Sequence, residues 1–119
     1  MLVTLVDDDE AVRESLPDLV KIFGYDVAVF PSAEAFMASD AIGKTDCLVL
    51  DINMPGMGGI ALFHELKRLG RKLPVVFITA KEDEALRVQL VSEGACDCLF
   101  KPFGDSALLA ALQVALENN

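Results

Sequence analysis

Short runs of consecutive apolar residues alternate along the chain with longer segments in which apolar residues recur every three or four positions. Apolar runs that are bounded by turn residues are typical of strands buried on both faces of a sheet. The runs with this pattern span residues 2–6, 26–30, 48–51, 75–79 and 96–100. Since the second run has mildly polar flanks, we expect it to lie at an edge of the sheet.

The segment after the first run predicts a long helix. Its apolar residues share one helical face, and Gly24 stands where a helix commonly ends; these residues are Val12, Leu16, Leu19, Val20 and Phe23. Pro17 falls inside this helix. An interior proline costs on the order of 3 kcal/mol, so we expect a kink or a local loss of helical structure there. Nothing in the sequence explains why a proline stands at this position.

Four further helices are predicted in the same way. Ser32 is a suitable N-cap for a short second helix. Apolar stripes predict helices that end near Gly70 and Gly94, and a last helix that Asp105 or Ser106 caps. Five strands that alternate with five helices through short connections predict an α/β fold, a doubly wound parallel sheet with helices on both faces.

Length and composition favour a single domain, residues 1–119. A chain of 119 residues is long enough to bury a core, and its apolar content of 53% excludes a disordered chain. The formal net charge of −9 argues against direct nucleic acid binding by this chain, because the cations that dominate such binding are lacking.

Cysteine usage and the amino terminus favour the cytoplasm. Cys47, Cys96 and Cys98 are odd in number and lack the spacing of a metal site, which is typical of reduced cysteines in a cytosolic protein. Asp7 interrupts the first apolar run too early for a signal peptide. No apolar run approaches the length that a membrane span needs.

Polar side chains follow four of the predicted strands at their carboxyl ends. Asp7 and Asp8 follow the first, Asp51 ends the third, Thr79 ends the fourth and Lys101 follows the fifth. Parallel strands end on the same side of a sheet, so we expect all five side chains on one rim, where ligands gather in open α/β sheets.

Three clustered carboxylates repel one another, by roughly 3 kcal/mol per pair at an effective dielectric constant near 20. Such a cluster is better explained by a bound cation, and oxygen ligands suit Mg²⁺. A lysine and a hydroxyl beside Asp51 would help phosphoryl transfer onto that carboxylate. The structural alternative for each residue alone is a role in capping or turns, which we expect for Asp9.

In these motifs the sequence resembles the receiver domain of two-component response regulators, over essentially the whole chain. The motifs stand at the family's spacing: Val6-Asp7-Asp8, Leu50-Asp51-Ile52-Asn53-Met54-Pro55, Ile78-Thr79-Ala80 and Lys101-Pro102-Phe103. Residues 6–13 and 31–36 most resemble the branch whose members often carry a helix-turn-helix output domain of the nitrogen-fixation regulator type. We expect residues 1–119 to hold the receiver domain alone, without an output domain.

The resemblance implies a flavodoxin-like fold with strand order 2-1-3-4-5 and a Mg²⁺-dependent reaction. Asp51 would accept a phosphoryl group from the phosphohistidine of a sensor histidine kinase. Asp7 or Asp8 would bind Mg²⁺ with Asp51 and the backbone carbonyl of Asn53. The resemblance also implies that Thr79 and Lys101 contact the phosphoryl oxygens and that the bond from Lys101 to Pro102 is cis.

Further implications concern activity and output. The chain would act as a phosphoacceptor with slow autodephosphorylation rather than as an enzyme, and it would regulate transcription through an effector domain. One departure from the family is Cys98, which stands where a tyrosine or phenylalanine usually reports activation.

The fourth helix suggests a contact surface. Val88 and Val91 share a face with Ala95, whereas Leu86 and Leu90 form an apolar pair turned away from it, so we expect that pair to be a contact surface or to be buried more deeply. We hypothesise a phosphorylation-dependent homodimer through helix four, strand five and helix five.

Three other classes of protein share parts of this pattern. A haloacid-dehalogenase-type phosphatase would place a second aspartate two residues after the nucleophile as general acid, but Asn53 stands there. A degenerate receiver that only binds partners would not need the complete acid, threonine and lysine set. A nucleotide-binding flavodoxin-like protein would need a glycine- or serine-rich phosphate loop after the first strand, where residues 7–10 are all acidic.

Overall fold

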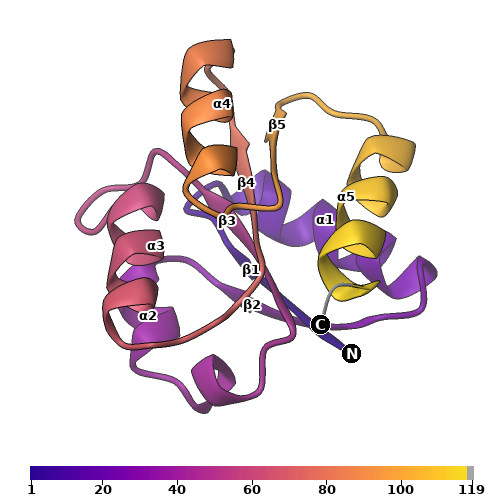
Figure 1. Ribbon diagram of the computed structural model, residues 1–119. Coiled ribbons are helices and arrows are strands. Elements are labelled where there is room, and N and C mark those ends of the chain that lie inside the picture. The colour runs from indigo at the N-terminus through magenta and orange to yellow at the C-terminus, as the bar shows by residue number, and fades with distance from the viewer. Residues whose placement is uncertain (118–119) are drawn as a thin grey trace.

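The computed structural model describes residues 1–117, so the last two residues of the expected domain 1–119 lie outside the described part. One five-stranded sheet forms the centre of the molecule, with all strands parallel in the order β2-β1-β3-β4-β5 (Figure 1). The strands are β1 (Leu2–Val6), β2 (Asp26–Phe30), β3 (Cys47–Asp51), β4 (Val75–Thr79) and β5 (Asp97–Phe100). The predicted parallel sheet, its order and the edge position of β2 are confirmed.

The helices lie in two layers on the sheet (Figure 1). Their bounds are α1 (Glu10–Ile22), α2 (Ala33–Met37), α3 (Gly59–Arg68), α4 (Glu84–Ser92) and α5 (Asp105–Glu117), with a short 3-10 helix η1 (Asp40–Gly43) before β3. Helices α1 and α5 pack on one face, and α2, α3 and α4 pack on the other.

Successive residues of a strand pack against the helices on opposite faces of the sheet. In β3, Leu48 and Leu50 face the α2–α4 layer, while Val49 faces α1 and α5. All three are fully buried. Full burial of such a side chain stabilises the fold by about 1.5–3 kcal/mol. Strand β3 is therefore packed on both faces, and this packing fixes the position of its carboxyl end.

Local capping agrees with the sequence. Asp9 caps α1 by accepting from the N–H of Ala11, and Ser32 caps α2 by accepting from the N–H of Ala35. Helix α1 continues through the buried Pro17, so helical structure is not lost there, and the expected kink stays a prediction.

Of the two alternatives for the Leu86 and Leu90 pair of the fourth helix, the structure shows deeper burial and not a contact surface. Leu90 is fully buried and Leu86 packs against the core of the α2–α4 layer. The exposed apolar residues of α4 are instead Val88 and Val91, at 59% and 42% exposure. Among the described residues, no helix has both the length and the hydrophobicity that crossing a membrane requires.

Candidate functional site: an acidic cluster at the carboxyl edge of the sheet

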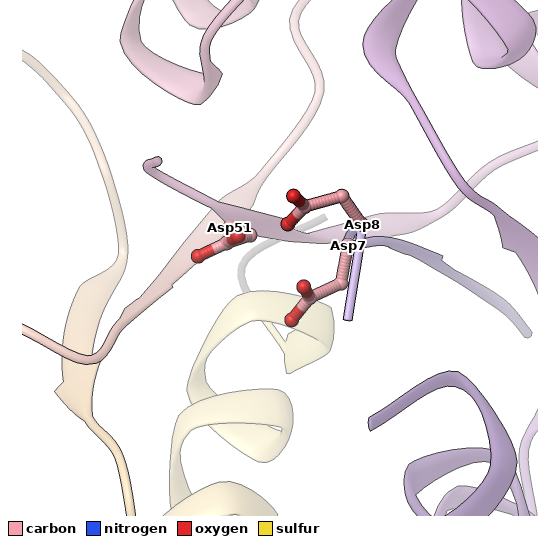
Figure 2. Close-up of side chains that lie close together, drawn as sticks. All are labelled: Asp7, Asp8 and Asp51. Carbon is pink, nitrogen blue, oxygen red and sulfur yellow. The ribbon is translucent and has the colours of Figure 1, made fainter. Parts of the chain in front are cut away.

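Three aspartates meet where β1 and β3 end. The pairing of Val6 with Leu50 sets these strands side by side, so the residues that follow are neighbours. Asp7, Asp8 and Asp51 each offer a carboxylate oxygen, and these oxygens all lie within 4.8 Å of one another. Figure 2 shows the three side chains close together at the strand ends. The acidic cluster predicted from the sequence is therefore present.

Asp7 is fully buried, and its carboxylate and backbone carbonyl accept hydrogen bonds. Its Oδ1 accepts from the backbone N–H of Asp9 at 2.9 Å, and its Oδ2 accepts from Lys101 Nζ at 2.8 Å. The Arg13 guanidinium donates to its backbone carbonyl at 3.0 Å. Sequence reasoning missed Arg13, although its place one helical turn after the Asp9 cap could have indicated that it reaches back to the loop.

Lys101 connects the two buried aspartates. Its ammonium lies 2.8 Å from Asp7 Oδ2 and 3.7 Å from Asp51 Oδ1. Burial works against the charged form of Lys101, but the hydrogen bond that Lys101 donates to Asp7 and the charge of Asp51 outweigh burial and raise the pKa of Lys101. The lysine therefore stays protonated beside the carboxylates. The Lys101–Pro102 peptide bond is cis, as the resemblance implied.

Asp51 is only 4% exposed. Burial above all, and then the charge of Asp7, raise its pKa from 3.8 to about 7, although Lys101 acts in the opposite direction. One lysine thus leaves the negative charge of this cluster only partly compensated.

Thr79 and Asn53 are linked beside the cluster. Thr79 stands at the end of β4, one residue past the partner of Asp51 in the adjacent strand. Its hydroxyl oxygen accepts from Asn53 Nδ2 at 3.3 Å and from the N–H of Lys81 at 3.2 Å. Since both contacts use the oxygen as acceptor, the hydroxyl hydrogen remains available to an incoming group.

The donor set fits a magnesium ion. All three candidate side-chain ligands are carboxylates, which Mg²⁺ prefers. Asp8 is exposed, so one side of the cluster is open to water, and Mg²⁺ commonly keeps several waters. A divalent charge would also offset the repulsion that raises the pKa of Asp51.

Cys98 is buried where the resembling family carries an aromatic residue. It is 3% exposed and packs with the core of the α2–α4 layer. Burial, with a smaller contribution from the charge of Asp97, raises the pKa of its thiol to about 11. A thiol that stays protonated is a poor nucleophile, so the residue acts as a small apolar side chain.

Comparisons with known proteins match most of this chain to one domain. The sequence profile of the response regulator receiver domain matches residues 3–113. The transcriptional regulatory protein FixJ of Azorhizobium caulinodans is 40% identical over 114 residues, which are 96% of this chain and 54% of FixJ. The chain spans about half the length of the curated relatives it matches.

Two solved structures show the same fold. The response regulator StyR is 41% identical, with a TM-score of 0.90 over 99% of this chain and 60% of StyR. FixJ-N is 35% identical, with a TM-score of 0.87 over 99% of this chain and 94% of that structure.

Proposed function

This chain belongs to the response regulator receiver family, and we propose that Asp51 is its phosphoacceptor in a Mg²⁺-dependent transfer from the phosphohistidine of a sensor histidine kinase. The observation that carries the proposal is the joint placement of Asp7, Asp8 and Asp51 with Lys101 at one rim. A cluster of this kind is costly to fold and useful for phosphoryl transfer.

In the proposed reaction, an Asp51 carboxylate oxygen attacks phosphorus as the P–N bond of the phosphohistidine breaks. The electron pair of that bond goes to the imidazole ring, and an aspartyl phosphate forms. Bound Mg²⁺, held by Asp7, Asp8, Asp51 and the carbonyl of Asn53, would supply positive charge that offsets the charge on the phosphoryl oxygens.

The chain's own residues position this reaction. Burial of Asp51 limits competing water, and the packing of β3 fixes the position of its carboxylate. Lys101 is anchored on Asp7 and lies within reach of Asp51, so its ammonium can contact a phosphoryl oxygen. The Thr79 hydroxyl can donate to another. In this proposal the chain accepts one phosphoryl group and later loses it by slow autodephosphorylation. It acts as a phosphoacceptor and not as an enzyme.

For output we propose homodimerisation through α4, β5 and α5 on phosphorylation. The exposed Val88 and Val91 offer apolar area on α4. Arg87 pairs with Glu84 at 2.9 Å and with Asp97 of β5 at 3.2 Å, so α4 and β5 present one connected surface. Cys98 stands where the family usually has a tyrosine or phenylalanine that reports activation. This surface would therefore respond to phosphorylation without movement of an aromatic side chain.

The proposed setting is a cytoplasmic two-component system. The FixJ relative is a transcriptional regulatory protein, and we extend this role to a protein that would join this receiver to an effector domain. Because the receiver has a net charge of −9, we expect the effector domain, and not the receiver, to bind DNA.

The direct test is intact mass after incubation with Mg²⁺ and acetyl phosphate. We expect the mass gain of one phosphoryl group in the wild type and none in Asp51→Asn, with the gain lost when EDTA removes the metal. An unchanged mass in the wild type, or an equal gain in Asp51→Asn, would refute the proposal.

A further inference from the structure

The loop between β3 and α3 begins directly after Asp51 and carries Asn53. Its base is closed by the N–H of Gly59, which donates to the carbonyl of Ile52 at 3.0 Å. Near its start, Asn53 Nδ2 donates to Thr79 Oγ1 at 3.3 Å. Both contacts hold the end of the loop that lies near the acidic cluster.

The far end of the loop is held by a residue of another helix. Glu34 lies in the first turn of α2, and its Oε2 accepts from the backbone N–H of Met57 at 3.1 Å. The contact joins residues 23 positions apart in sequence. Figure 1 shows α2 and α3 next to each other on one side of the sheet, and both contribute to the same core cluster.

Gly56 shows how closely the carboxylate approaches. A Cβ at this position would lie 2.5 Å from Glu34 Oε2, and the residue has φ of +75°, in the left-handed region that favours glycine. The loop backbone is thus shaped to receive the carboxylate. An exposed glutamate on a helix ordinarily extends into water, so this approach needs a reason.

We infer that Glu34 is a positioning residue for the metal site, because it fastens the loop that presents the backbone carbonyl of Asn53. This inference rests on the proposed function, which makes that carbonyl a ligand. With both ends of the loop held, the carbonyl is oriented before the ion arrives, and binding costs less ordering entropy. Without Glu34, the ion itself must order the loop.

A purely structural role for Glu34 makes a different prediction. An acidic residue in the first turn of a helix stabilises that helix through the helix dipole. Removal of Glu34 would then lower the melting temperature and leave the intrinsic affinity for Mg²⁺ unchanged.

Calorimetric titration with Mg²⁺, without any phosphodonor, separates these roles. We expect Glu34→Ala to weaken Mg²⁺ binding about 3- to 10-fold, at or below the usual cost of losing an outer-shell partner. Glu34→Gln keeps an acceptor oxygen and should retain most of the affinity. Asp40→Ala is the matched control, because Asp40 is an exposed acid in the first turn of η1. It should bind Mg²⁺ like the wild type.

Hydrogen exchange provides a readout that needs no metal. The Met57 amide should exchange faster in Glu34→Ala than in the wild type and Glu34→Gln, whereas amides of β3 should be unaffected. Gly56→Ala should also weaken Mg²⁺ binding, and by a smaller factor when Glu34 is already alanine, because the clash with Oε2 is then gone.

Two results would overturn the inference. One is a Mg²⁺ affinity of Glu34→Ala equal to that of the wild type. The other is a loss of Mg²⁺ affinity in Glu34→Gln as large as the loss in Glu34→Ala. The second result would assign the effect to charge alone. If the wild type itself bound no Mg²⁺, the proposed metal site would fail instead, and the exchange of the Met57 amide would still decide whether Glu34 fastens the loop.

Discussion

At the scale of single residues, the buried charge of Asp51 serves the proposed function and lowers the stability of the fold. Asp51 is buried beside Asp7, and Lys101, 3.7 Å away, offsets part of the charge. In metal-free buffer at pH 7.5, Asp51→Asn should therefore stabilise the domain, by on the order of 2 kcal/mol. Urea unfolding measures this change, and Asp18→Asn, at an exposed site on α1, should have almost no effect.

Magnesium should stabilise the wild type more than it stabilises Asp51→Asn. Binding to the folded state alone raises the melting temperature with the ratio of free ligand to dissociation constant. We expect millimolar Mg²⁺ to raise the melting temperature of the wild type clearly and that of Asp51→Asn much less. Equal rises in both proteins would argue against Asp51 as part of the metal site.

The raised pKa of Asp51 also predicts how stability depends on pH. Its pKa is about 7 in the folded protein, against an ordinary value of 3.8 for an aspartate. Between these values the folded state holds a proton that the unfolded chain has released, so stability is highest below pH 4 for this group and falls as the pH rises toward 7. The loss attributable to Asp51 is on the order of 4 kcal/mol. Metal-free unfolding across this window should show it as the difference between the wild type and Asp51→Asn.

At the scale of elements, the contact between β3 and α3 is close enough to demand glycine. A Cβ on Gly59 would overlap the carbonyl of Asp51, so α3 starts directly against the end of β3. Gly59→Ala must push this helix away and should destabilise the fold by about 1–3 kcal/mol. Gly104→Ala is the control, since a Cβ there meets nothing within 4 Å. Thermal unfolding of both variants tests this, and equal melting temperatures would contradict it.

Element boundaries were predictable where local chemistry decides them. The caps by Asp9 and Ser32 and the five strands follow from side-chain oxygens and apolar runs. The orientation of α4 was not. Its apolar residues surround much of the helix, so periodicity alone could not tell which side the sheet covers, and the structure buries Leu90 and exposes Val88 and Val91.

At the scale of the whole molecule, the proposed dimer would use that exposed face. Changing Val88 and Val91 together to glutamate should keep the fold, because both side chains are exposed, and should abolish dimerisation induced by beryllofluoride. Ile22→Glu is the control, since Ile22 is 78% exposed on α1, on the other layer. Light scattering gives the mass. A wild type that stays monomeric with and without beryllofluoride would count against the dimer.

The sequence by itself determined the alternating α/β fold, the rim that collects Asp7, Asp8, Asp51, Thr79 and Lys101, and the family. These follow because apolar runs and strand ends are local features, and parallel strands place their carboxyl ends together.

Only the tertiary structure decided which groups hold that rim in place. Arg13 on the carbonyl of Asp7 and Glu34 on the N–H of Met57 are contacts to backbone atoms, which leave little trace in residue types. The pKa of Asp51 likewise depends on burial and on the charges of Asp7 and Lys101, which follow β1 and β5 and lie near Asp51 only in the folded sheet.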